Sequence, residues 1–338
     1  MPIKMKDIAQ DLGLSQVTVS KVLRDHPDIS EETRQRVLRR VDELDYRPNE
    51  LARGLATGRS YLVGLIVPGI LHSFFAEIAI GLSSMISAKG YSLIVASSEE
   101  RKDVEQEQIR KLLARRLDAL VIASSGAGTE LFEQMDKQSQ PYVLIDRELP
   151  GLNANFIGVD DIKAGFIATK HLCEIGRRRI AHIAGRANST AAPRRLEGYT
   201  MALEQLGILY REDYVVHGAF ADTDSTEQGY EAMNALLELA NPPDAVFCHN
   251  DPLAIGAMNS VFDAGLEIPK DVAIIGCGNL DFRSSLRVPL SSVDQQSAKL
   301  GEQAGQLILD ILRAKKKQDI QRIILEPKVV VRASTKIG

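Results

Sequence analysis

The sequence predicts a small all-α headpiece followed by a larger α/β body, whose two lobes are each a doubly wound parallel sheet. Three observations predict this fold. The 338 residues are enough for two or three domains with sizeable cores. Apolar residues recur at helical spacing up to about residue 46, with no strand pattern. From Tyr61 onward, short apolar runs alternate with stretches long enough for crossover helices, which is typical of parallel sheets covered on both faces.

The composition is that of an ordinary globular protein, with 44% hydrophobic and 25% charged residues, and it excludes collagen-like or wholly disordered chains. The three cysteines are far apart and lack CxxC spacing, so we expect a reducing cytoplasm. No basic, apolar leader opens the chain. Its most apolar window, residues 61–82, contains Pro68, His72 and Glu77, so we expect no membrane partner.

The headpiece, residues 1–46, is expected to hold three short helices. The first covers residues 5–12, because its apolar residues share one face, and it ends at Gly13. Ser15 can cap the second helix, and Ser30 can cap the third.

The spacing of Ala9, Gly13 and Val19 predicts a helix-turn-helix. Such a motif needs a small residue where the two helices touch, a glycine in the tight turn, and an apolar residue on the second helix that packs back onto the first. All three requirements are met. A small helical bundle with a solvated polar face remains the alternative.

If the motif reads DNA, its second helix presents side chains that suit base edges, since Gln pairs with adenine, Lys with guanine and Val with the thymine methyl. The net charge of −4 gives no such indication, so the argument depends on where these residues lie. The expected base readers are Gln16, Val17, Lys21 and, beyond the helix end, Arg24. The expected phosphate contacts are Ser15, Thr18, Ser20, Thr33 and Arg34.

Residues 47–60 form a linker between headpiece and body. The segment has little apolar surface, several arginines, and glycines at Gly54 and Gly58, so an isolated helix here would be marginal. We expect it to become ordered only on a partner.

Eight apolar runs predict the strands of the body. They are Tyr61–Val67, Tyr91–Ala96, Ala119–Ala123, Tyr142–Ile145, Ile180–Ala184, Val215–Gly218, Ala245–Cys248 and Val272–Ile275. One closed barrel is the alternative to two sheets. We favour two sheets because residues 149–161 resemble a crossing between lobes, and residues 289–293 and 320–325 suit a second and a third. The first lobe would then cover about 61–158 and 294–322, and the second lobe about 159–293 and 323–338.

Three strings carry a resemblance to a known family: DIAQDLGLSQVTVSKVL, DISEETRQRVLRRVDELDYRPN and LARGLATGRS. Residues 4–60 resemble the headpiece and hinge of the LacI/GalR family of bacterial transcriptional regulators. Since the body has the fold class that this family requires, the resemblance covers essentially the whole chain. It implies a periplasmic-binding-protein-like body, residues 61–338, that binds an effector and forms the dimer.

The resemblance implies that Gln16, Val17 and Lys21 read the major groove of operator DNA. It further implies that the linker folds into a hinge helix on DNA and that a leucine is wedged into the minor groove, where an apolar side chain can kink the duplex. The DNA contacts expected in and beside this hinge are Tyr46, Asn49, Arg53, Leu55 and Ala56.

Ligands of two-lobed α/β folds bind at the carboxyl ends of strands. Candidate effector residues that follow strands or the second crossing are His72, Ser73, Phe75, Asp146, Arg147, Asn250, Asp251, Gly278, Asn279 and Gln295. The resemblance adds Asp160, Arg195 and Phe220. Asp, Asn and Arg around an aromatic ring suit a sugar-like molecule. Asp160 and Asp251 could instead cap helices, and Asp146 and Arg147 could form a surface pair.

One departure from the family bears on the effector. Sugar-responsive members usually carry an aspartate where this chain has Gly278. Either the effector lacks the diol that this aspartate binds, or Asn279 replaces it, or the protein responds to another kind of molecule. His72, Arg147 and Arg195 together would favour an anionic ligand such as a sugar acid or a phosphate.

The sequence therefore predicts a homodimeric, cytoplasmic repressor that binds pseudo-palindromic double-stranded DNA under the control of a sugar-like effector. The dimer interface is expected on the helix after Phe75, through Ile78, Leu82, Met85 and Ile86. No cofactor, metal or enzymatic activity is expected, since phosphate-loop, nucleophile-elbow and metal-ligand motifs are absent from the sequence. The alternatives are a solute-binding protein without a DNA role and a corepressor-dependent regulator of non-sugar metabolism.

Overall fold

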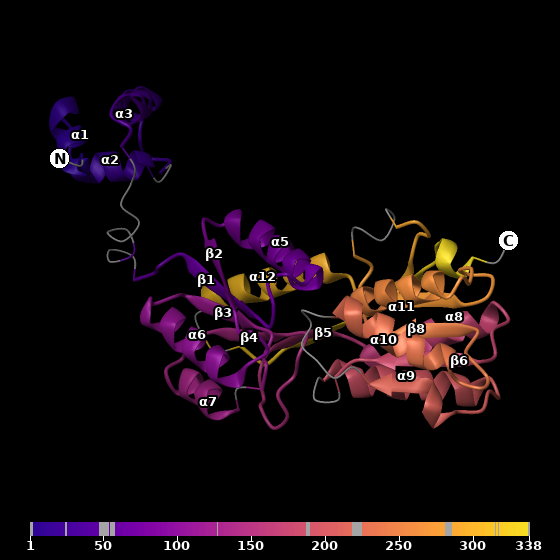
Figure 1. Cartoon of the computed structure of the whole chain (residues 1–338). Coiled ribbons are helices and arrows are strands. Elements are labelled where there is room, and N and C mark those ends of the chain that lie inside the picture. Colours follow the sequence, from indigo (N-terminus) through magenta and orange to yellow (C-terminus); the bar gives the residue numbers. More distant parts are fainter. Residues whose placement is uncertain are drawn as a thin grey trace. The chain divides into compact units, whose positions relative to one another are not determined.

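A computed structural model describes residues 3–23, 26–46, 54, 58–126, 128–186, 190–217, 225–280, 286–314, 316 and 318–336 (Figure 1). The chain divides into two compact units, Met1–Ser60 and Tyr61–Gly338, which we call the headpiece unit and the body.

The described part of the headpiece unit holds three α-helices: α1 (Met5–Leu12), α2 (Gln16–Leu23) and α3 (Glu31–Glu43). Ile8, Val19 and Val37 are fully buried and join the three helices in one apolar core. Gly13 ends α1 in the left-handed conformation, with φ of 65°. The expected helix-turn-helix is confirmed, and it forms because these apolar residues lie on the facing sides of their helices.

The first lobe of the body is built on a parallel sheet, which has six strands in the described residues. Its order is β11-β5-β4-β3-β1-β2. The strands are β1 (Leu62–Val67), β2 (Ser92–Ser97), β3 (Ala119–Ile122), β4 (Tyr142–Ile145), β5 (Phe156–Val159) and β11 (Arg322–Leu325). One face is covered by α5 (Ser73–Ser87) and α12 (Ser297–Arg313), and the other by α6 (Lys102–Ala114) and α7 (Glu130–Lys137).

The second lobe repeats this architecture. Its described strands form a six-stranded sheet of order β12-β10-β9-β8-β6-β7, parallel except for β12. They are β6 (Ile180–Ala184), β7 (Val215–His217), β8 (Ala245–Cys248), β9 (Ala273–Cys277), β10 (Ser291–Asp294) and β12 (Lys328–Val330). The faces are covered by α8 (Asp161–Glu174) with α9 (Ala191–Gln205), and by α10 (Ser225–Leu237) with α11 (Asp251–Asp263). Short 3-10 turns lie at Glu212–Tyr214 and Ala333–Thr335.

Two separate sheets exclude the barrel alternative. Among the described residues, the chain passes between the lobes after β5, after β10 and after β11. The third crossing therefore lies beyond Leu325, three residues later than the predicted boundary at residue 322. The reason is that β11 pairs along its whole length with β5, from Arg322 opposite Phe156 to Leu325 opposite Val159.

Glycines let the covering helices of the body approach closely. A Cβ at Gly198 of α9 would lie 1.9 Å from the carbonyl oxygen of Ile162 in α8, and one at Gly256 of α11 would lie 1.9 Å from that of Thr226 in α10. Gly301 of α12 stands in the same relation to α5. The same kind of contact therefore recurs in both lobes, because only glycine leaves room for the facing backbone.

Three of the four expected dimer residues on α5 do not lie on the surface of the body, and the fourth, Met85, is half-buried. Ile78, Leu82 and Ile86 are fully buried against the sheet and α12. The large apolar side chains that this region exposes are Ile70, at 54% exposed, Leu71, at 91%, and Ile80, at 68%. Helical periodicity shows which face of a helix is apolar and therefore buried. It does not show whether that face packs against the same chain or against a second subunit, and here it packs within the chain.

In the ranges that the structure describes, no helix combines the length and the apolar character needed to cross a membrane.

Candidate functional site

The outer face of α2 carries the predicted base readers. Gln16 is exposed, and Val17 is 63% exposed although it is a large apolar residue. Lys21 forms an ion pair within the headpiece, in which its Nζ donates a hydrogen bond to Oδ2 of Asp28. This hydrogen bond lowers the pKa of the Asp28 carboxyl, so Asp28 is a carboxylate at neutral pH.

Several predicted phosphate contacts have structural partners in the headpiece. Oγ of Ser15 accepts from the backbone N–H of Thr18 at 3.0 Å, and Oγ of Ser30 donates to Oγ1 of Thr33 at 2.9 Å. Both serines thus lie at helix starts, as expected for capping residues. Arg34 donates to the carbonyl of His26 at 2.9 Å. Ser20 is half-buried on α2.

Tyr46 is placed differently from its prediction as a DNA contact. Its side chain is only 9% exposed and packs in the headpiece core, and burial raises the pKa of its hydroxyl. The phenol ring supplies apolar area that the small headpiece needs. The other hinge predictions, Asn49, Arg53, Leu55 and Ala56, and the predicted base reader Arg24 lie outside the described residues.

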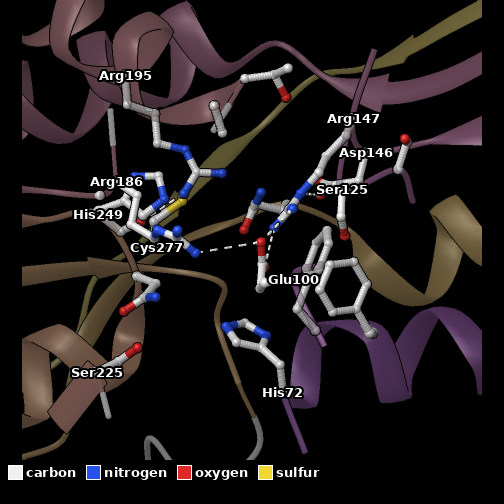
Figure 2. Close-up of a pocket in the computed structure, with 18 of the residues that line it drawn as sticks. His72, Glu100, Ser125, Asp146, Arg147, Arg186, Arg195, Ser225, His249 and Cys277 are labelled. Atoms are coloured by element: carbon white, nitrogen blue, oxygen red, sulfur yellow. Dashed lines mark hydrogen bonds and ion pairs between the residues drawn. The ribbon is translucent and has the colours of Figure 1, made fainter. Parts of the chain in front are cut away.

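A cavity of about 310 Å³ lies between the lobes and is lined by residues of both (Figure 2). The structure brings together in its lining these predicted effector residues: His72, Phe75, Asp146, Arg147, Arg195, Asn250 and Gln295. They meet because most of them follow strands whose carboxyl ends face the cleft, as the topology rule requires.

Arg195 anchors the second-lobe wall of the cavity and is only 4% exposed. Its Nε donates to Oδ1 of Asp161 at 2.8 Å, and its Nη1 donates to the carbonyl of His249 at 2.6 Å. A buried guanidinium is stable only with such partners, so Asp161 and the His249 carbonyl fix its position.

The ring of His249 also lines the cavity, directly beside Arg195 (Figure 2). Burial lowers the pKa of His249 well below its ordinary value, and the charge of Arg195 lowers it further. The ring is therefore neutral at pH 7. Among the described residues, none forms a hydrogen bond with its buried Nδ1.

The first-lobe wall is dominated by an ion pair between Arg147 and Glu100. Nη1 and Nη2 of Arg147 donate to Oε2 and Oε1 of Glu100 at 3.0 and 2.8 Å. Arg186, from the second lobe, places its Nη1 3.8 Å from Oε2 of the same carboxylate. Arg147 also pairs with Asp146, with Nε 3.8 Å from Oδ2, but both residues line the cavity, so this pair does not lie on the surface.

Five predicted effector residues do not line the cavity. Asp160 caps α8 by accepting from the N–H of Lys163 at 2.9 Å. Asp251 is fully buried and accepts from the N–H of Leu280 and from Oγ of Ser292. The other three are Ser73, Gly278 and Asn279. One further predicted effector residue, Phe220, lies outside the described residues.

Asn279 is turned away from the cavity, so it does not replace the missing aspartate. Its Oδ1 accepts from Nη2 of Arg332 at 2.7 Å, and its backbone is left-handed, with φ of 55°. A Cβ at Gly278 would lie 3.4 Å from Oδ2 of Asp251. The carboxylate of Asp251 therefore lies beside the space that an aspartate at position 278 would enter.

Several cavity residues were not predicted from the sequence: Glu100, Arg186, Ser225 and His249. Cys277, which ends β9 and was expected near the cleft as a residue at a strand end, does line the cavity. Glu100, Arg186 and His249 follow β2, β6 and β8, so the strand-end rule applied to every strand would have found these three. Ser225 begins α10 and had no such signal.

Comparison with known proteins gives two family matches. The description "Bacterial regulatory proteins, lacI family" matches residues 4–49, and "Periplasmic binding protein-like domain" matches residues 169–335. The HTH-type transcriptional repressor PurR of Haemophilus influenzae (strain PittEE) is 32% identical over 337 residues, which is 98% of each chain.

Solved structures show the same likeness along the chain. A structure of the transcriptional regulator CelR in complex with cellobiose is 29% identical, with a TM-score of 0.73, and the match covers 98% of this chain and 99% of that one. The Lac repressor dimer, at 24% identity, a TM-score of 0.84 and 99% coverage of both chains, supports the fold. The matches to a LacI-type headpiece and to a periplasmic-binding-protein-like body follow one another along this chain, and PurR matches it over 98% of each chain, so the chain belongs to the LacI family of bacterial regulatory proteins.

Proposed function

We propose that this protein is a homodimeric, cytoplasmic transcriptional repressor whose operator affinity is set by a small molecule in the interlobe cavity. One observation carries the proposal: a helix-turn-helix with an exposed reading face belongs to the same chain as an interlobe cavity lined by arginines from both lobes. A solute-binding protein without a DNA role does not need the first feature. An enzyme needs a reacting group in the cavity, and its arginines and acids are paired with one another instead.

The similar proteins support both halves of the proposal. PurR is described as a transcriptional repressor, and CelR was solved with cellobiose, a sugar. The cavity of this chain has the size of a small polar metabolite and the aromatic wall of Phe75 that a sugar ring can use.

We propose dimerisation because one headpiece contacts only a few base pairs, so that useful affinity needs two half-sites. Leu71 and Ile80 suit the interface, since both are exposed apolar residues beside or on α5. Residues 1–46 would bind the major groove, residues 47–60 would form the hinge, and residues 61–338 would bind the effector and the second subunit.

Selection of operator DNA from a random double-stranded library tests the proposal. The purified full-length protein should retain a pseudo-palindrome with a flexible central step, because two symmetric headpieces and a hinge wedge require one. The variant Leu55→Ala should bind this DNA with less bending and keep its effector affinity. If no motif is recovered even in the presence of small metabolites from a cell extract, the headpiece is not a DNA reader.

With the operator in hand, reciprocity tests the allosteric part. An effector that weakens operator binding must itself be bound more weakly, by the same factor, when operator is present. A corepressor would give the opposite sign with the same symmetry. Identical effector affinity with and without operator would contradict the proposed coupling.

A further inference from the structure

Glu100 brings a carboxylate into the cavity lining from the loop that follows β2. The residue follows β2 of the first lobe, and its carboxylate points between Arg147 and Arg186 (Figure 2). Arg147 belongs to the first lobe and Arg186 to the second, so two arginines converge on one carboxylate from opposite sides of the cleft. Guanidinium groups arranged in this way bind carboxylates and phosphates.

We propose that Glu100 is an internal stand-in for the acidic group of the effector, and that the effector carries an oxyanion which replaces Glu100 between Arg147 and Arg186. This inference deepens the proposed function, because it names the chemistry of the molecule that the same cavity binds. It makes Glu100 and Arg186 determinants of effector specificity.

The charges around the site between Arg147 and Arg186 favour an exchange of one anion for another. Arg147 and Arg186 face Glu100, and Oδ2 of Asp146 lies 3.8 Å from Nε of Arg147. While Glu100 is in place, the two positive charges of the arginines are matched by the two negative charges of Glu100 and Asp146. If Glu100 withdraws, one positive charge is left over in a largely buried site, where the side chains of Arg147 and Glu100 are 16% and 17% exposed. Screening is weak at such exposure, so a single negative charge on the ligand restores the balance.

Two other acids beside the cavity, Glu148 and Asp161, are held by arginines of their own. The buried carboxyl of Glu105, which also interacts with the charges of Arg147 and Glu100, instead accepts hydrogen bonds from Oγ of Ser124 and the N–H of Ser125. Glu148 lies 2.7 Å from Nη2 of Arg322 and 3.5 Å from Nη2 of Arg194, and Asp161 pairs with Arg195. Glu148 therefore provides a matched comparison for Glu100, since it lines the same cavity and also bridges two arginines.

The backbone of the Glu100 loop supports a movable carboxylate. Glu99 and Glu100 are both left-handed, with φ of 52° and 57°. Residues with a Cβ rarely adopt this conformation because it costs free energy, so two in succession mark a strained turn. Withdrawal of Glu100 would let the turn relax, which offsets part of the lost ion pair.

Anion binding by charge-matched variants tests the proposal without DNA. Wild type, Glu100→Gln and Glu148→Gln would be titrated calorimetrically with inorganic phosphate and, separately, with acetate, at constant ionic strength. If the Glu100 carboxylate occupies the site between Arg147 and Arg186 about nine-tenths of the time, it weakens the apparent affinity for an added anion about tenfold. Glu100→Gln should therefore bind one of the two anions about tenfold more tightly than wild type, and Glu148→Gln should gain less than about twofold.

The preferred anion indicates whether the effector is a phosphate or a carboxylate. In the background of Glu100→Gln, the further change Arg186→Gln should abolish the gain. Glu100→Ser serves as a second neutral variant if Glu100→Gln does not fold. The proposal is overturned if neither neutral variant gains affinity for either anion, or if Glu148→Gln gains as much. Since no operator is used, failure here leaves DNA binding untouched, and failure of DNA selection leaves this result standing.

Discussion

Nζ of Lys21 lies 2.5 Å from Oδ2 of Asp28, and Nδ1 of His26 lies 2.6 Å from the other carboxylate oxygen. The side chain best suited to read guanine is thus held by an acid of its own headpiece. Because both partners are substantially exposed, the pair contributes little to stability. If Lys21 reads a base, as its place on α2 predicts, the ion pair must break or rearrange first, and its effect would be on DNA binding.

Releasing Lys21 should strengthen DNA binding. Asp28→Asn is expected to increase operator affinity severalfold and to steepen the dependence of log affinity on log salt by about one unit, since one more cation becomes available to DNA. Fluorescence anisotropy with labelled operator at several salt concentrations measures both. Asp11→Asn removes the same charge from a pair with Arg40 and is the control. Equal behaviour of the two variants would mean that only net charge matters.

The buried pair of Arg195 and Asp161 should be costly to break. Asp161→Ala leaves a guanidinium without its carboxylate in a site where both side chains are at most 7% exposed. We expect a loss of about 3 kcal/mol in the free energy of unfolding, together with loss of effector binding. Urea unfolding gives the first value. Glu107→Ala, which breaks an exposed pair with Lys111, should cost less than about 1 kcal/mol. Similar costs for both variants would contradict the buried role.

The close contact of α8 and α9 predicts a strong effect of one methyl group. Gly198→Ala would place its Cβ against the carbonyl of Ile162, so the helices must separate, and we expect destabilisation of about 3 kcal/mol. Gly69→Ala is the matched control, because a Cβ there meets nothing within 4 Å. Thermal unfolding compares the two. A melting temperature of Gly198→Ala that equals that of Gly69→Ala would show that the helices do not meet as described.

The sequence could predict whatever depends on periodicity and on strand ends. The spacing of Ala9, Gly13 and Val19 was enough to predict the helix-turn-helix. Ala9 and Val19 pack in the core between the helices, and Gly13 takes the left-handed conformation that the turn requires. The direction of side chains beyond a strand end could not be predicted. Asn250 lines the cavity, whereas Asp251 turns inward to Leu280 and Ser292. Adjacent residues at a helix start point to different sides, and only the packed partners decide which side is the cavity.

Glu100 shows the same limit more strongly. Its place in the cavity depends on two left-handed residues in succession, and no propensity favours that conformation for glutamate. The strand-end rule can place Arg186 near the cleft, but its contact with the carboxylate of Glu100 is visible only in the structure. The chemistry that distinguishes this cavity therefore comes from tertiary structure rather than from a motif.

Acid should destabilise the body through a buried histidine. The His182 ring stacks between Tyr199 and Phe247 and is fully buried, and burial lowers its pKa from 6.5 to about 4. Below pH 6.5 the unfolded chain binds a proton at this position that the folded chain does not bind. Stability is therefore lost as the pH falls from about 6.5 towards 4. Between pH 7.5 and 5.5 this amounts to about 1.4 kcal/mol.

The variant His182→Phe removes the titrating group and keeps a ring in the stack. At pH 7.5 it should be about 1 kcal/mol less stable than wild type, because the carbonyl of Phe247 loses the ring nitrogen at 2.9 Å as its hydrogen-bond partner. The loss of stability between pH 7.5 and 5.5 should be smaller than in wild type by about 1.4 kcal/mol, while titration of His249 persists in both proteins. Urea unfolding at pH 7.5 and at pH 5.5 separates the two effects. Loss of the hydrogen bond lowers the free energy of unfolding equally at both pH values, whereas loss of proton linkage changes only the difference between the two free energies. An unchanged difference would mean that His182 is not held neutral by the fold.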